Sequence, residues 1–135
     1  MNTKTIDLKI RDYNFVKLLK LCEVRSVTKS TIIREALNIF LTHNQDTNLS
    51  YFNNFNRQTL FSKNLQVRLP ILTVSAFDEM CINKCVNRVT LINIILGYYL
   101  DNRESEIKEY EDLWGEITIE KGGTIYEPKM FERSV

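Results

Sequence analysis

The sequence predicts a mainly helical protein that contains one two-stranded antiparallel β-ribbon. Two short segments alternate strictly between apolar and polar residues, and each is followed by stretches in which apolar residues have helical spacing. This order of a strand followed by helices occurs twice, at a constant distance along the sequence that aligns Lys4 with Lys63. With 135 residues, 44% hydrophobic and 26% charged, the composition is typical of one or two small globular domains.

The alternation occurs in Thr5–Ile10 and again in Asn64–Leu69. In each segment every second side chain is apolar, which predicts a half-buried strand with its apolar side chains on one face. A short strand is not stable alone and needs a partner. We therefore expect Thr3–Arg11 to pair antiparallel with Lys63–Leu69, with the polar side chains facing outward.

The first strand is followed by two predicted helices. Asp12 is of a residue type favoured at N-caps, and the helix that it is expected to cap has Phe15 and Leu18 on its apolar stripe. A polar break follows at Arg25-Ser26. The apolar spacing then predicts a second helix from about Thr28 to Leu41.

The second strand is followed by the same arrangement. Pro70 ends the strand, and Thr73 or Ser75 is expected to cap the next helix. After a polar break at Asn83-Lys84, a last helix is expected from about Asn87 to Leu100. Because this helix is apolar on most sides, it should be deeply buried.

Residues 4–43 can be laid on residues 63–102 without gaps, and residues that coincide in this alignment are counterparts. Identical counterparts such as Cys22 with Cys81 and Thr31 with Thr90 are few, but the apolar and polar classes match along both stretches. A strand–helix–helix unit of this size cannot bury its own apolar faces. We therefore expect the two copies to pair about a pseudo-twofold axis, with four helices closing over the apolar side of the ribbon.

The chain divides into four parts on this interpretation. They are a first unit (residues 1–43), a linker (44–62), a second unit (63–102) and an acidic C-terminal extension (103–135). The linker is rich in aromatic residues, so we expect part of it to pack on the helices; the alternative is an aromatic patch for another protein. The extension predicts an acidic helical continuation from Asp101 to about Trp114, then a small hairpin around Gly122-Gly123.

Charge is distributed unevenly although the net charge is only +1. Residues 1–100 contain 13 Lys and Arg against 7 Asp and Glu, whereas residues 101–135 contain 5 against 10. A basic body indicates a polyanionic partner such as nucleic acid. The simpler alternative is a mildly basic domain with a solvated acidic tail.

Several classes of function find no support in the residues. No apolar run reaches the ~18 residues of a membrane span, and three cysteines without paired spacing fit a reducing compartment, so we expect a cytoplasmic protein. Cys22, Cys81, Cys85 and His43 lack the spacing of a zinc site, and we expect the cysteines to lie in the core. With no Gly-rich phosphate loop and no nucleophile–base pair, we predict no cofactor, no small-molecule ligand and no enzyme activity.

The segments Ile6–Ile10 and Thr28–Leu37 resemble the strand and the second-helix opening of the ribbon-helix-helix superfamily, the Arc/MetJ type of DNA-binding protein. The first copy is the better match, since the second has Asn93 and Ile95 where the motif has Arg and Ala. Family members are usually homodimers of single units. Two units in one chain are similar to the tandem members, including TraY-type conjugation proteins and some viral regulators. The resemblance implies a ribbon-helix-helix pseudo-dimer that binds double-stranded DNA.

The resemblance also implies which side chains meet the DNA. In the family the two-stranded ribbon enters the major groove, and its outward side chains contact base edges. Asn and Gln suit adenine, Arg suits guanine, and an Asp repels phosphate unless it accepts from a cytosine amino group. Two unlike strands imply an asymmetric subsite. The base-contacting residues carried over are Thr5, Asp7, Lys9, Asn64, Gln66 and Arg68.

The family's second contact is with the DNA backbone. The N-terminus of the second helix of each unit faces a phosphate, where free N–H groups and the helix dipole favour an anion. The alternative for these residues is ordinary N-capping. The phosphate-contacting residues carried over are Thr28, Lys29 and Ser30 in the first copy and Asn87 and Arg88 in the second.

The function expected from the resemblance is a sequence-specific transcription regulator, acting as a repressor in the cytoplasm of its own cell or of a host. Three alternatives stay open. They are a conjugation, relaxosome or partition accessory that binds DNA in the same way, an antitoxin whose acidic tail occupies a toxin, and an interaction module that binds no DNA. Further association of chains along DNA through the linker or the extension is also left open.

Overall fold

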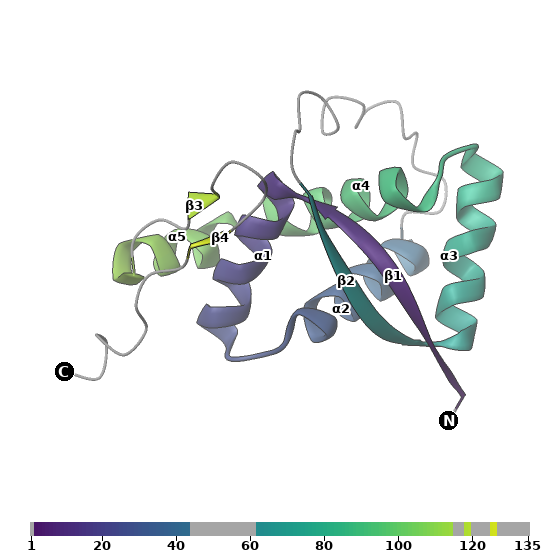
Figure 1. Cartoon of the computed structure of the whole chain (residues 1–135), viewed down its shortest axis with the longest axis horizontal. Coiled ribbons are helices and arrows are strands. Elements are labelled where there is room, and N and C mark those ends of the chain that lie inside the picture. The colour runs from purple at the N-terminus through teal and green to yellow at the C-terminus, as the bar shows by residue number, and fades with distance from the viewer. Residues whose placement is uncertain (1, 44–61, 115–117, 120–124, 127–135) are drawn as a thin grey trace.

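The computed structural model describes residues 2–43, 62–114, 118–119 and 125–126. It is mainly helical, with an antiparallel two-stranded ribbon lying across the helices (Figure 1), which confirms the predicted combination of helices and a β-ribbon. Among the described helices, none has the length and apolarity that a membrane crossing requires. The elements are β1 (Thr3–Arg11), α1 (Asp12–Arg25), α2 (Lys29–His43), β2 (Ser62–Pro70), α3 (Ile71–Lys84), α4 (Arg88–Asp101), α5 (Glu104–Trp114), β3 (Thr118–Ile119) and β4 (Ile125–Tyr126).

The ribbon is formed by β1 and β2, which pair antiparallel from Thr3 opposite Pro70 to Arg11 opposite Ser62. The alternation of the sequence becomes an alternation of burial, because Ile6, Leu8 and Val67 face the helices and are nearly inaccessible. The polar residues between them are exposed. One face of the ribbon is therefore part of the core, and the other is open to solvent.

The constant offset found in the sequence recurs in the element bounds. It relates β1 to β2 and α1 to α3 at both ends, and it relates the first residues of α2 and α4, Lys29 and Arg88. Asp7 lies opposite Gln66, its own counterpart in the second copy. The register of the ribbon is thus centred on this pair.

The turns after α1 and α3 have the same backbone conformation. Ser26 and Cys85, which are counterparts, both have a φ of 56°. This left-handed conformation is uncommon outside glycine and typically ends a helix. In each turn the next amide donates to a carbonyl near the helix end, Val27 to Cys22 at 3.1 Å and Val86 to Cys81 at 3.0 Å. The second break therefore falls after Lys84, at Cys85.

Two predicted helix caps were wrong, one at the start of α1 and one at the start of α3. Asp12 is the first residue of α1, and Thr73 and Ser75 lie inside α3, which begins at Ile71. Each strand passes directly into its helix, so the last strand residue, Arg11 or Pro70, occupies the N-cap position and no side chain caps. A pattern of residue types does not reveal such a direct junction, because it favours the nearest residue with a capping side chain.

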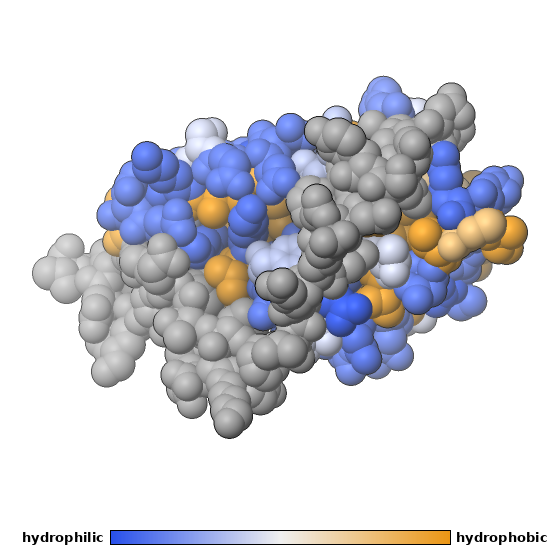
Figure 2. All heavy atoms as spheres, turned by 90° about the horizontal axis from the view of Figure 1, so that it is seen from above, coloured by the Kyte–Doolittle hydropathy of each residue, from blue (hydrophilic) through white to orange (hydrophobic). Residues whose placement is uncertain are grey.

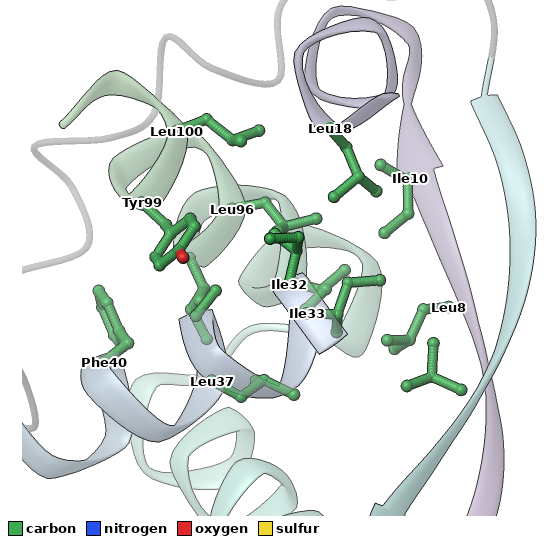
Figure 3. Packing of buried hydrophobic residues seen from close by; sticks show 14 of the residues in the cluster. Leu8, Ile10, Leu18, Ile32, Ile33, Leu37, Phe40, Leu96, Tyr99 and Leu100 are labelled. Carbon is green, nitrogen blue, oxygen red and sulfur yellow. The ribbon is translucent and has the colours of Figure 1, made fainter. Parts of the chain in front are cut away.

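The core lies between the ribbon and the helices (Figure 3), and α4 contributes most to it. Its residues from Leu91 to Gly97 are all buried, as the prediction of a deeply buried helix requires. Side chains from four elements meet there: Leu8 and Ile10 of β1, Leu18 of α1, Ile32, Ile33, Leu37 and Phe40 of α2, and Leu96, Tyr99 and Leu100 of α4.

The C-terminal extension is only partly described. Asn102 and Arg103 form a turn, so α5 is a separate helix and not a continuation of α4. β3 pairs antiparallel with β4, the two strands that flank the predicted Gly-Gly turn. The turn itself and the predicted packing of the linker lie outside the described residues.

One polar side chain, Asn93, is completely buried in the core. Its amide oxygen accepts from the Arg11 backbone N–H at 2.8 Å and from Asn14 Nδ2 at 3.1 Å. Its amide nitrogen donates to the carbonyl oxygens of Lys9 at 3.0 Å and Val89 at 2.7 Å. Asn93 therefore fastens the end of β1 and the start of α1 to α4.

The counterpart of Asn93 in the first copy is Arg34, which is exposed on α2. The difference has a backbone cause. The counterpart of Arg11 is Pro70, which has no N–H to satisfy. A buried amide at position 34 would lack that donor, and the arginine at this position is exposed instead.

Replacing Asn93 by alanine should lower the free energy of unfolding by about 1–3 kcal/mol, because the Arg11 N–H and the Asn14 amide lose their buried acceptor. Urea denaturation measures the change. Arg34→Ala, the matched substitution at the exposed counterpart, should change it by less than about 0.5 kcal/mol. Equal stabilities of the two variants would contradict this role of Asn93.

Candidate nucleic-acid interface

The six predicted base-contacting residues lie together on the outer face of the ribbon. The register places them in three facing pairs, and all six side chains are exposed. Facing residues in an antiparallel ribbon have Cβ atoms about 5 Å apart. Successive pairs follow one another at about 6.8 Å along the strands. The three rows are Thr5 with Arg68, Asp7 with Gln66, and Lys9 with Asn64.

The ribbon is strongly basic. Its two strands contain five basic residues and a single acidic one, Asp7. On the outer face, the side chains of Asp7, Lys9 and Arg68 make no hydrogen bond or ion pair with any described residue. Charged groups of both signs thus lie on this face without a partner among the residues that the structure describes. The five basic residues are Lys4, Lys9, Arg11, Lys63 and Arg68.

The cations of α1, unlike those of the ribbon, pair with carboxylates of α4 and α5. Lys17 contacts Asp101 and Glu104, each at 3.1 Å, and Lys20 pairs with Glu111 of α5. In Figure 1, α5 lies against α1 on the side away from the ribbon. Three acidic side chains of α5, those of Glu104, Glu106 and Glu111, therefore pair with α1 and not with the candidate interface.

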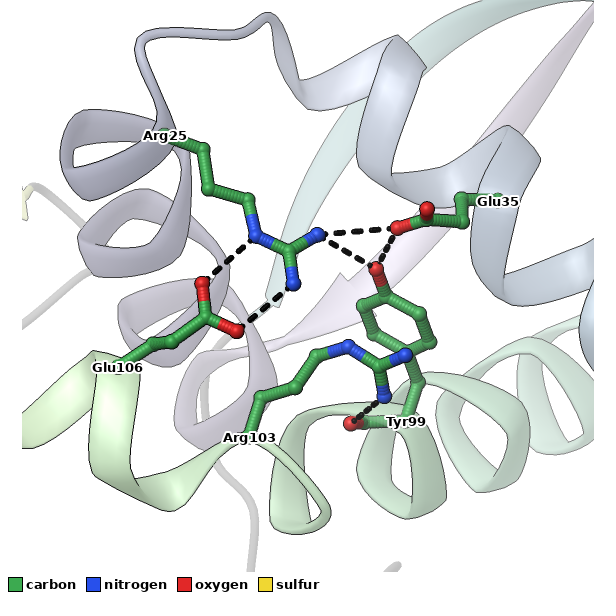
Figure 4. Close-up of polar contacts among 5 residues, drawn as sticks. All are labelled: Arg25, Glu35, Tyr99, Arg103 and Glu106. Atoms are coloured by element: carbon green, nitrogen blue, oxygen red, sulfur yellow. Dashed lines mark hydrogen bonds and ion pairs between the residues drawn. The ribbon is translucent and has the colours of Figure 1, made fainter.

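The strongest of these contacts centres on Arg25 (Figure 4). Its Nε and Nη2 donate to both carboxylate oxygens of Glu106 at 2.8 Å, and its Nη1 donates to Glu35 and to the Tyr99 hydroxyl at 3.0 Å. Arg103 stacks on the Tyr99 ring, 3.5 Å from its centroid. The cluster joins α1, α2, α4 and α5.

The two ends of the molecule differ in the hydropathy of their surface (Figure 2). At the end of the molecule where α1 and α5 lie, many of the visible side chains are hydrophilic, with smaller apolar patches between them. Apolar atoms appear at the opposite end, which α3 forms; Ile82 of that helix is 76% exposed.

The predicted phosphate-contacting residues lie at the first turns of α2 and α4. Thr28 and Asn87 act as N-caps, since Thr28 Oγ1 accepts from the Thr31 N–H at 3.2 Å and Asn87 Oδ1 from the Thr90 N–H at 2.8 Å. A hollow of about 500 Å³ separates the start of α2 from β2, and its lining includes Lys29, Ser30 and Gln66. The α2 end is thus open beside the ribbon.

The two helix ends differ in their basic residue. Arg88 donates to both oxygens of Asp78, at 2.8 and 2.7 Å, and these hydrogen bonds lower the pKa of that carboxyl and raise the pKa of Arg88. The counterpart of Asp78 is Leu19. Lys29, the counterpart of Arg88, makes no ion pair with a described residue. The sequence contains no signal for this difference, because Asp78 and Arg88 come together only across the turn between α3 and α4.

The three cysteines do not form a site. Cys81 is buried, Cys22 is half-buried and Cys85 is exposed, so the prediction that all lie in the core was wrong for Cys85, which occupies the left-handed turn. Desolvation raises the pKa of the Cys22 thiol to about 11. Within the described ranges, no three His, Cys, Asp or Glu residues gather in a way that could hold a metal ion.

The ion pair between Arg25 of α1 and Glu106 of α5 should stabilise the protein less in acid. Hydrogen bonds from Arg25 lower the pKa of Glu106 below its ordinary value of 4.5, so the unfolded chain takes up this proton first as the pH falls. The stabilisation by this ion pair is complete above the pKa that Glu106 has in the unfolded chain. It is lost as the pH falls through the lower pKa that Glu106 has in the folded protein. We expect Glu106→Gln to cost about 0.5–1 kcal/mol at pH 7, since the pair is partly exposed, and to flatten the fall in stability below pH 5.

Thermal unfolding between pH 3 and 7 measures this dependence. Glu109→Gln, an exposed carboxylate of the same helix, is the control and should keep the profile of the unmodified protein. Identical profiles for the unmodified protein and Glu106→Gln would contradict the stabilising role of the ion pair between Arg25 and Glu106.

The ribbon therefore combines exposed hydrogen-bonding side chains with charged groups that have no ion pair within the described part of the chain, and helix ends flank it. Comparison of the chain with models of protein families, with curated proteins and with solved structures finds no match.

Proposed function

We propose that this protein is a sequence-specific double-stranded DNA-binding protein of the tandem ribbon-helix-helix type, and that it regulates transcription as a repressor. The observation that carries the proposal is the outer face of the ribbon. It presents six exposed hydrogen-bonding side chains in three rows, and its charged groups have no partner among the described residues.

The dimensions of the ribbon suit the major groove. This groove is about 12 Å wide and admits a two-stranded ribbon, whose strands lie about 4.8 Å apart. Rows about 6.8 Å apart match two base-pair steps of about 3.4 Å. Arg68 then bonds guanine, Gln66 and Asn64 bond adenine, and Lys9 bonds guanine less selectively.

The flanking helix ends support a second set of contacts. The first N–H groups of α2 and α4 and their dipoles favour an anion such as a phosphate. At α2 the chain offers two hydroxyls, from Thr28 and Ser30, and the cation of Lys29, which has no ion pair with a described residue. These contacts position the protein on the duplex, whereas the ribbon selects the sequence.

The tandem interpretation is supported by the repetition of the strand–helix–helix order with one constant offset and by a register centred on equivalent residues. We assign it as a repressor because a compact protein that occupies the groove would exclude other proteins from the same DNA. The toxin-binding alternative receives less support, because three acidic residues of α5, Glu104, Glu106 and Glu111, already pair with cations of α1.

Arg68→Ala should weaken binding to the preferred sequence by about 1–3 kcal/mol and relax selectivity at one base position, because a bidentate contact to guanine is lost. Fluorescence anisotropy with a duplex selected from a random pool measures both effects. Lys108→Ala, which removes an exposed cation from α5, is the control and should leave the preference unchanged. If Arg68→Ala changes neither affinity nor preference, the ribbon is not the reading element.

Lys29→Ala should weaken binding to all sequences alike and reduce the slope of log K against log salt by about one, because one phosphate contact is removed. Arg88→Ala, the matched change in the second copy, should cost less, since Asp78 already engages that guanidinium. Salt titrations of both variants on the same duplex make the comparison. A larger loss of affinity in Arg88→Ala than in Lys29→Ala would contradict the proposal that the start of α2 contributes more to phosphate binding than the start of α4.

A further inference from the structure

Asp7 is the single acidic residue of the ribbon, and it lies at the centre of the outer face. Its side chain is exposed and stands opposite Gln66, in the middle of the three rows. The outer rows on either side each contain one cation, Arg68 or Lys9. The charge on the face thus runs positive, negative, positive along the ribbon.

The carboxylate is not held by its cationic neighbours. Lys9 is two residues further along the same face, about 6.8 Å away along the strand, and Arg68 is a diagonal neighbour on the other strand. Both have side chains long enough to reach Asp7, yet neither forms an ion pair with it. The carboxylate serves no contact within the described part of the chain.

Its place decides what it meets on DNA. The centre of a ribbon inserted in the major groove faces base edges, and the ends of the strands approach the phosphates. A negative charge is costly beside phosphates, but at the centre it meets donors and acceptors of the bases. An ionised carboxylate only accepts hydrogen bonds, so it requires a donor there.

The four bases differ in what they offer to such a group. Cytosine presents its N4 amino group, a donor. Guanine presents the acceptors N7 and O6, and thymine presents the acceptor O4 beside a methyl group. Adenine has a donor at N6 but an acceptor, N7, directly beside it. Cytosine is the base that satisfies a carboxylate without opposing it.

We propose that Asp7 is a specificity-determining residue that selects a cytosine at the centre of the DNA subsite. This rests on the proposed function, because it assigns one position within the sequence that the ribbon reads. The same carboxylate lowers affinity for DNA in general, so it contributes discrimination and not strength. Because Gln66 stands opposite and prefers adenine, the centre of the subsite is also asymmetric.

The experiment selects duplexes from a pool with a randomised central segment, using the unmodified protein, Asp7→Asn and Glu109→Gln. The last variant removes an exposed carboxylate of α5. We expect a conserved central C·G pair for the unmodified protein and for Glu109→Gln. Changing that pair to T·A should weaken their binding roughly 10- to 100-fold.

In Asp7→Asn the same base change should cost less than about threefold, because an amide both donates and accepts. Its affinity for unrelated DNA should rise, since a negative charge is removed from the ribbon. Because Asp7 is exposed, the variant should unfold at the same temperature as the unmodified protein. A melting curve therefore serves to confirm that the variant is folded.

The possible failures separate the two claims. If the unmodified protein selects no sequence and binds DNA without salt dependence or not at all, the proposed function fails. If it selects a sequence that Asp7→Asn selects equally, or one without a central cytosine, the assignment of Asp7 is overturned while the proposed function stands.

Discussion

The antiparallel pairing of β1 with β2 is the interaction on which the rest of the structure depends. Two strands alone are marginal in water, so the ribbon is stable only when one face is covered. Ile6, Leu8 and Val67 provide that face, and helices from both halves of the chain cover it. The pairing therefore joins the halves into one core. It also forces every second side chain outward, and the face with the candidate site is a direct consequence of folding.

The backbone repeats with a constant offset, but the side chains at equivalent positions do different work. Arg34 is exposed where Asn93 is buried, and Lys29 has no ion pair with a described residue where Arg88 is held by Asp78. Each difference has a local cause, such as the missing N–H of Pro70, the counterpart of Arg11. A single chain can diverge in this way, because a change in one copy is not imposed on the other, as it is in a homodimer.

Much of the fold was predictable because it follows from periodicity. The change from period two to helical spacing located both strands and their helices, and alternation alone placed Asp7, Lys9 and Arg68 on one face. The facing pairs depend on register, which a pattern of residue classes does not specify. The docking of α5 was not foreseen, because Lys17 and Arg25 have the pattern of solvated surface cations until a second helix brings carboxylates to them.

That docking changes the meaning of the charge distribution. The sequence suggests a basic body opposed by an acidic tail, which would weaken attraction to a polyanion. Instead, carboxylates of α5 form ion pairs with cations of α1, on a side of the molecule away from the ribbon. Among the described residues, Lys9 and Arg68 on the outer face of the ribbon and Lys29 beside it keep their positive charge without an ion pair. If the protein binds DNA as proposed, an acidic helix on the side away from the ribbon would help to orient it, because the negative charge of that side is repelled by the phosphates.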